Sequence, residues 1–186
     1  MWGDSEEARV NHYRGIVTLT NGGPERLVYD GFDAAEASAV DGTEFYESGT
    51  LFHGPMFQVI DRALNSSEGR LTLECTTRNL SAKDQGQFPT DAQDLYATDV
   101  KFQALLIWAR QFREAGALPT SFTRCEQYRA ITPGERFYLS LEIESATNAR
   151  VTGTITIHDE HGEVFSRIIG AETTISKTLT FVAATQ

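Results

Sequence analysis

Alternating apolar and polar residues predict strands over much of the chain. In the segment 69–78, Leu71, Leu73 and Cys75 alternate with charged and hydroxyl residues, which is typical of a half-buried strand. The segment 9–20 also alternates, and an Asn-Gly-Gly-Pro turn follows it. Beyond residue 116 the pattern predicts further strands, separated by Gly134, Asn148 and an Asp-Glu-His-Gly turn, at 119–130, 136–145, 150–158 and 163–175.

One long helix is predicted from about Asp94 to Ala115, and Gly116 is expected to end it. Apolar residues lie on almost all of its sides as far as Arg110, so the helix should be buried on most sides. An antiparallel sheet wrapped around the helix would bury it, whereas an ordinary sandwich would leave one helical face in water. The sequence therefore predicts an α+β fold of the hotdog type, preceded by a loosely helical linker at 30–43.

The amino-acid composition argues against some classes of binding partner. The 186 residues carry a net charge of −10 and the pI is about 4.8, so the surface repels phosphate backbones and anionic lipid heads. We therefore expect no binding to nucleic acid or to a membrane. No apolar run reaches transmembrane length and no signal peptide is visible, so a cytoplasmic location is expected. Cys75 and Cys125 are interpreted as small core residues in a reducing compartment.

An acidic residue near the start of the predicted helix is the main candidate for chemistry. Asp99 stands in an otherwise apolar segment, and Gln103 follows four residues later on the same helical face. Burial would raise the pKa of the Asp99 carboxyl and keep it protonated, as a general acid requires. The alternative is that Asp99 is an ordinary N-cap or first-turn residue stabilised by the helix dipole, and the spacing alone favours this alternative.

The histidines give weaker signals. His53 precedes a Gly-Pro turn whose aromatic neighbours could line an apolar tunnel, and the alternative is a turn with a surface histidine. His158 and His161 flank a predicted hairpin tip and are expected to be exposed, while His12 is expected to be structural. No spacing of histidines and acids indicates a metal site, and the sequence has no nucleophile elbow, GxGxxG motif or phosphate-binding loop.

Two motifs, in order, resemble the dehydratase domains of polyketide synthases. FHGPMFQVI at 52–60 resembles the signature, with Tyr or His before Gly-Pro, that opens the second hotdog of these domains. ATDVKFQALLIWA at 97–109 resembles their helix motif, and Leu118-Pro119 with the strand that follows resembles the segment after that helix. The resemblance covers about residues 45–175, and the His variant is most similar to dehydratases of polyunsaturated-fatty-acid synthases.

The resemblance implies a double hotdog, of which this chain is the second, Asp-bearing half. Such enzymes remove water from a 3-hydroxyacyl thioester carried on the phosphopantetheine of an acyl carrier protein and leave the 2-enoyl thioester. No further cofactor and no metal is implied. Carried onto this chain, Asp99 is the general acid and Gln103 its neighbour in the motif, and the residues implied to bind substrate near the tunnel are His53, Gly54, Pro55, Phe57 and Gln58.

The histidine base of the family is missing from this chain. In the family it lies in an HxxxGxxxxP pattern on the first hotdog, and none of the four histidines fits that pattern. Residues 1–44 are therefore expected to be the end of the preceding hotdog or a linker, and 45–186 the hotdog domain. The expected partners are an acyl carrier protein, a His-bearing first hotdog in cis or in trans, and a second copy in a homodimer. The alternatives are a non-catalytic scaffold or dimerisation module and a hotdog acyl-CoA thioesterase.

Overall fold

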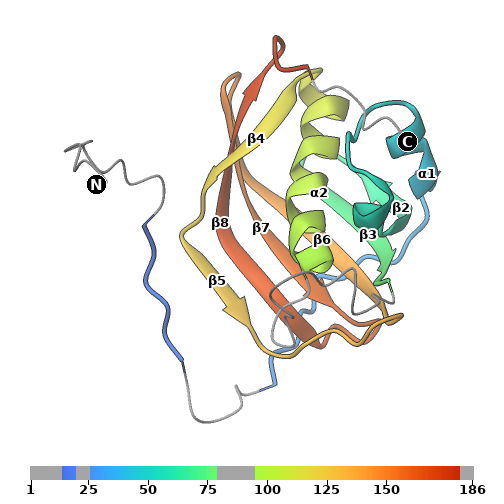
Figure 1. Cartoon of the computed structure of the whole chain (residues 1–186), viewed down its shortest axis with the longest axis vertical. Coiled ribbons are helices and arrows are strands. Elements are labelled where there is room, and N and C mark those ends of the chain that lie inside the picture. The colour runs from blue at the N-terminus through green and yellow to red at the C-terminus, as the bar shows by residue number, and fades with distance from the viewer. Residues whose placement is uncertain (1–13, 20–25, 79–94, 181–186) are drawn as a thin grey trace, which may run out of the picture.

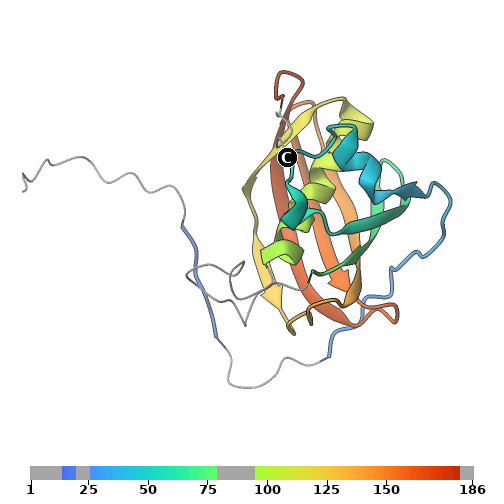
Figure 2. The same cartoon turned by 45° about the vertical axis from the view of Figure 1, so that its right-hand side comes forward.

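An antiparallel sheet curls around one long helix in the computed structural model, which describes residues 14–19, 26–78 and 95–180. The strand order is β1-β2-β3-β6-β7-β8-β4, and β5 also pairs with β8. Figure 1 shows α2 lying across the sheet, and the turned view in Figure 2 shows the curvature of the sheet around it. The helices are α1 (Gly42–Glu47), the short 3-10 helix η1 (Pro55–Phe57) and α2 (Leu95–Arg113); the strands are β1 (Val40–Asp41), β2 (Ile60–Ser66), β3 (Arg70–Thr76), β4 (Gly116–Ser121), β5 (Arg124–Gln127), β6 (Arg136–Ala146), β7 (Arg150–His158) and β8 (Val164–Ser176).

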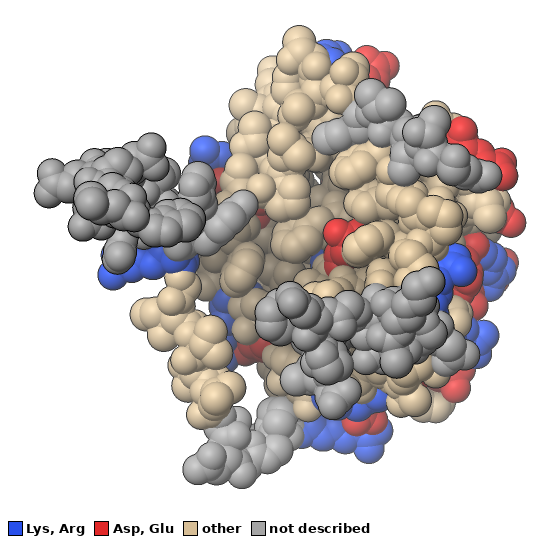
Figure 3. Space-filling view, in the orientation of Figure 1, with Lys and Arg blue, Asp and Glu red and all other residues tan. Residues whose placement is uncertain are grey.

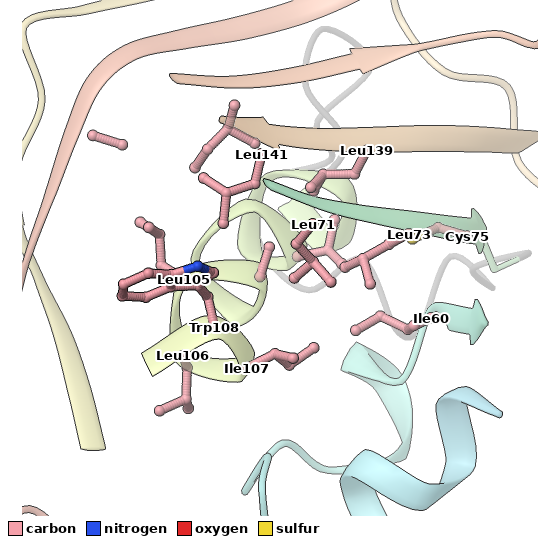
Figure 4. Close-up of a cluster of buried hydrophobic side chains, with 14 of the residues drawn as sticks. Ile60, Leu71, Leu73, Cys75, Leu105, Leu106, Ile107, Trp108, Leu139 and Leu141 are labelled. Carbon is pink, nitrogen blue, oxygen red and sulfur yellow. The ribbon is translucent and has the colours of Figure 1, made fainter. Parts of the chain in front are cut away.

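The helix α2 is buried because apolar side chains cover almost all of its sides. Ala104, Ile107 and Trp108 are fully shielded from water. The indole N–H of Trp108 donates to the carbonyl oxygens of Ser67 and Glu68, at 3.1 and 3.2 Å, which satisfies its one polar group. Figure 4 shows side chains of α2 meeting leucines of β3 and β6. The prediction of a hotdog fold with a central buried helix is confirmed.

The C-terminal end of α2 differs from the prediction. The helix ends at Arg113, Glu114 takes the left-handed conformation with φ of 52°, and Gly116 is already the first residue of β4. Gly116 is required there for a different reason, because a Cβ at this position would collide with the carbonyl oxygen of Leu179.

None of the helices in the described ranges is long and apolar enough to cross a bilayer.

The strands after α2 follow the predicted pattern with one correction. The single strand predicted at 119–130 is two strands, β4 and β5, and both pair with β8. They separate opposite Gly170, which has a φ of 61° and where a Cβ would collide with the side chain of Thr123. Cys75 is buried as predicted, but Cys125 on β5 is exposed, so its interpretation as a core residue is wrong.

The residues before the hotdog differ more from the prediction. Of the strand predicted at 9–20, only 14–19 is described; this part has no strand partner, and its apolar side chains are almost fully exposed. The linker at 30–43 is not helical before Gly42, where Asp41 caps α1 by accepting a hydrogen bond from the backbone N–H of Thr43. The boundary predicted between residues 44 and 45 falls inside α1 and stays a prediction.

Residues 26–33 form a strap across the face of the sheet opposite α2. The strap pairs with the turn between β7 and β8, where the N–H of Tyr29 donates to the carbonyl oxygen of Gly162 at 2.8 Å. An ion pair between Arg26 and Glu163 adds to this attachment. The aromatic side chains of the strap, Tyr29 and Phe32, cover His158. His158 is fully buried, so the prediction that it is exposed is wrong. His161, at the tip of the same hairpin, is exposed as predicted.

Candidate active site

Asp99 lies on α2 beyond its first turn, because the helix begins no later than Leu95. The alternative of an N-cap or first-turn role is therefore wrong. The side chain is 32% exposed, so the expected withdrawal from water is only partial. Both of its contacts within the described part of the chain are made through Oδ2, which accepts a hydrogen bond from Gln103 Nε2 at 2.8 Å and lies 3.4 Å from His53 Nε2. The second oxygen, Oδ1, accepts no hydrogen bond from the described residues.

Gln103 fixes the orientation of Asp99. The predicted spacing of four residues on one helical face brings the two side chains together, and Gln103 is only 1% exposed. Its amide nitrogen also donates to the carbonyl oxygen of Phe57 at 2.9 Å, and its Oε1 accepts from the Tyr46 hydroxyl at 3.0 Å. Both amide hydrogens and the amide oxygen are thus engaged, so the amide cannot rotate without breaking these bonds.

Tyr46, on α1, is a site residue that sequence reasoning missed. Burial raises the pKa of its phenol far above the ordinary value of 10, so the hydroxyl stays protonated and keeps donating to Gln103. The two residues are 57 positions apart in the chain, and no local motif links them. Only the packing of α1 against the rest of the hotdog brings the phenol to this place.

His53 contacts Asp99 directly, so the alternative of a surface histidine is wrong. Its side chain is 14% exposed, its ring stacks on Phe52 with centroids 4.3 Å apart, and its Nδ1 is buried with no hydrogen-bond partner among the described residues. Burial lowers the pKa of the imidazole below its ordinary value of 6.5, and the Asp99 carboxylate acts in the opposite direction. His53 is therefore neutral near neutral pH.

The Gly-Pro turn holds His53 in place. Gly54 precedes η1, which Pro55 begins, and the carbonyl oxygen of Gly54 accepts from the N–H of Phe57. The Gln58 side chain donates back to the carbonyl oxygen of His53 at 3.0 Å. The predicted substrate-binding residues therefore have different structural roles. His53 contacts the carboxyl of Asp99. Gly54, Pro55 and Gln58 form the turn that holds His53.

The surroundings of the acid are mostly uncharged. Phe57 packs on Tyr96 of α2 with centroids 4.9 Å apart, and about a third of Phe57 and of Met56 is exposed beside it. Asp99 is the one Asp or Glu of α2. In Figure 3, a small acidic patch lies in a hollow among uncharged residues in the region of α2. Within the described ranges no cluster of His, Cys, Asp or Glu could hold a metal ion. The arrangement suits a carboxyl that exchanges one proton with a largely apolar ligand.

Comparison with known proteins gives one family and a consistent fold. Residues 33–178 match the family described as the polyketide synthase dehydratase N-terminal domain. A polyunsaturated fatty acid synthase protein of Thraustochytrium sp. (strain ATCC 26185 / S-3) is 33% identical over 165 residues, which make up 84% of this chain but only 6% of that protein.

Solved structures of dehydratase domains share the fold at low sequence identity. The dehydratase domain of a mycocerosic acid synthase-like polyketide synthase superposes with a TM-score of 0.61 at 18% identity, over 87% of this chain and 56% of that one. The dehydratase domain of RzxB from Pseudomonas fluorescens gives a TM-score of 0.60 at 13% identity, over 81% and 54%. This chain therefore spans about half of each solved domain.

Proposed function

The chain belongs to the polyketide synthase dehydratase family, and we propose on this basis that it is the acid-bearing hotdog of a dehydratase acting on a 3-hydroxyacyl thioester. The family description names an N-terminal domain, whereas the order of the motifs favours the second hotdog. The carboxyl of Asp99 on the central helix is the observation that carries the proposal, because Gln103 holds one of its oxygens and the other has no hydrogen-bond partner among the described residues.

In the proposed reaction a base removes the α-proton of the substrate, and the electron pair of that C–H bond forms the new double bond. The bond between Cβ and the hydroxyl breaks, and the hydroxyl takes the proton of Asp99 and leaves as water. Gln103 and Tyr46 keep the carboxyl oriented throughout, since their hydrogen bonds run in one chain from α1 to α2. The substrate is proposed to arrive on the phosphopantetheine of an acyl carrier protein, with no other cofactor.

The base is proposed to come from a His-bearing hotdog in cis or in trans. Of the histidines in the described ranges, His158 is sealed on the opposite face of the sheet, His161 is exposed at a hairpin tip, and the Nδ1 of His53 is closed off from water. The solved dehydratase domains are about twice the length that this chain matches, which leaves room for such a second hotdog.

A reconstituted enzyme tests the proposal. The chain is combined with a His-bearing hotdog, a 3-hydroxyacyl-pantetheine thioester is supplied, and formation of the 2-enoyl product is followed. Asp99→Asn should lower kcat by about 10²–10⁴-fold, as expected when a general acid is lost. Asp30→Asn, at an exposed position of the strap, is the matched control and should leave the rate unchanged. Full activity of Asp99→Asn would rule out the proposed role, and release of free CoA from acyl-CoA by the chain alone would favour the thioesterase instead.

We also propose that the isolated chain self-associates. The strands β4 and β5 form an edge of the sheet, and Leu118 and Phe122 beside this edge are 43% and 52% exposed. Light scattering at micromolar concentration should therefore give the mass of a dimer. Phe122→Lys should shift the mass towards that of the monomer, and a monomeric wild-type chain would contradict the idea.

A further inference from the structure

Lys101 on α2 is a lysine inside the protein, with an exposed fraction of only 1%. It follows Asp99 by two residues, so its side chain leaves the helix on the side opposite to the candidate active site. Its amine forms no hydrogen bond and no ion pair with another group in the described part of the chain. Lysine is almost never fully buried unless it is paired, so this amine calls for an explanation.

Cys125 lies on the face of β5 that is turned towards α2. In the register of β5 with β8 it stands opposite Ile168, which belongs to the same core as the buried side chains of α2. Residues directly opposite each other in an antiparallel pair point to the same face of the sheet. The next pair along these strands, Glu126 and Arg167, forms an ion pair on the other face. The thiol of Cys125 therefore points towards the helix.

The amine and the thiol interact, but only the thiol is open to water. Figures 1 and 2 both show β5 at the edge of the sheet, beside the N-terminal part of α2. Burial lowers the pKa of the Lys101 amine below its ordinary value of 10.5, and the negative charge of a Cys125 thiolate acts in the opposite direction. Cys125 is exposed, whereas Lys101 is buried. A large reagent can therefore reach the sulfur but not the nitrogen.

We propose that Cys125 and Lys101 form a site of covalent modification by acyl thioesters, in which the exposed thiol takes up the acyl group and the buried amine retains it. In the first step the sulfur of Cys125 attacks the thioester carbonyl carbon. The bond from that carbon to the pantetheine sulfur breaks, and the pantetheine thiol leaves with the proton of Cys125. In the second step the nitrogen lone pair of Lys101 attacks the same carbon, the bond to the Cys125 sulfur breaks, and an amine proton passes to that sulfur.

The burial of Lys101 favours both the second step and its product. Because burial lowers the pKa of the amine, a larger share of it carries the free lone pair that attacks a carbonyl. The amide that forms has no charge, so acylation removes the cost of keeping an ammonium group away from water. A short acyl group such as acetyl suits this confined position. The modification uses neither Asp99 nor a complementing hotdog, so it is independent of the proposed dehydration.

Incubation of the whole chain with acetyl-CoA, followed by mass spectrometry of its peptides, tests the proposal. The wild-type chain should gain an acetyl group on Lys101 that resists hydroxylamine, as an amide does. Lys101→Met keeps an apolar side chain of similar length, and its label should stop at Cys125 as a thioester that hydroxylamine removes. Cys125→Ser should acylate Lys101 about tenfold more slowly or worse, because the group that delivers the acetyl is gone.

Lys177 provides a control within the same chain. It is exposed and pairs only with Glu114, so direct acylation from solution would label it before the buried Lys101. A wild-type chain that labels Lys101 faster than Lys177 supports delivery through Cys125, and Lys177→Met should leave the labelling of Lys101 unchanged. Faster labelling of Lys177, equal labelling of Lys101 in the wild type and Cys125→Ser, or a thioester that stays on Cys125 of the wild type would overturn the proposal.

Discussion

Two histidines, one in strand β7 and one in the segment between α1 and η1, occupy contrasting environments. His158 is fully buried on the outer face, where its Nε2 lies 2.9 Å from Ser140 Oγ and its Nδ1 lies 2.7 Å from the carbonyl oxygen of Asp159. A carbonyl oxygen only accepts, so Nδ1 carries the hydrogen and Nε2 accepts from the serine hydroxyl. His53, on the side of α2, has one long contact to a carboxyl and one nitrogen without a partner among the described residues.

The difference shows what each histidine contributes. Every polar atom of the His158 ring is satisfied, and Tyr29, Phe32 and Tyr138 surround it with ring centroids 4.8 to 6.1 Å away. Such a group attaches the strap to the sheet and stabilises the fold. The His53 ring retains unsatisfied bonding capacity next to an acid, which is a cost to stability and is typical of a functional site. The following predictions test this contrast.

The largest effect is expected from His158→Ala. The change removes a fully buried ring, empties the space between three aromatic side chains and leaves the Ser140 hydroxyl without its partner. It should lower the free energy of unfolding by about 3 kcal/mol, measured by urea denaturation. His161→Ala, at the exposed tip of the same hairpin, is the control and should change little. Equal stability of the two variants would contradict a structural role for His158.

Removal of the Gln103 amide, which holds Asp99, should lower kcat more than it lowers the free energy of unfolding. Gln103→Leu is close in volume but deletes the bond to Asp99, so kcat of the reconstituted enzyme should fall about 10–100-fold. Gln127→Leu, on the exposed strand β5, is the matched control. If Gln103→Leu loses stability but keeps its kcat, the amide serves the fold rather than the site.

A smaller effect is expected from Tyr46→Phe. This variant keeps the ring but removes the hydroxyl that donates to Gln103, so it should cost about 1 kcal/mol of stability and lower kcat a few-fold. Tyr128→Phe also loses one hydrogen bond, to Glu126, but lies away from the site. Its kcat should match that of the wild type, and a similar loss of rate in both variants would contradict the proposed chain of bonds from α1.

The smallest effect concerns the pH dependence of stability. Burial lowers the pKa of His158 and of His53 below 6.5, so between 6.5 and the folded pKa values the unfolded chain binds more protons than the folded one. The contribution of these two histidines to the free energy of unfolding should therefore be complete above pH 6.5. It should decline as the pH falls from 6.5 through the pKa values of the folded chain. Thermal melts in a pH series should show this decline, and His158→Gln should weaken it. A melting temperature that rises on acidification would contradict the assignment.

The sequence pattern predicted the parts of the fold that depend on local periodicity. The helix α2 and the strands β3, β6, β7 and β8 lie within one or two residues of their predicted bounds at most ends, because alternation and helical periodicity directly report which side faces the core. The pairing of Asp99 with Gln103 could be predicted for the same reason, since their spacing is set by a single helix.

What the pattern could not predict depends on contacts between distant segments. Alternation places His158 on the outer face of β7, but it does not say that an aromatic strap more than a hundred residues earlier covers that face. In the same way, the contacts of Tyr46 with Gln103 and of His53 with Asp99 join elements from different parts of the chain. Family motifs located His53 near the site but did not show that it touches the acid.

The strap has a practical consequence for work with this protein. The family match begins at residue 33, so a gene fragment trimmed to the matched span would lack Tyr29 and Phe32. The ring of His158 and the neighbouring Tyr138 would then face water, and the backbone groups of Gly162 and Val164 would lose their partners. Such a fragment should be expressed in poor yield and should aggregate on concentration, whereas one that starts before Arg26 keeps the outer face closed.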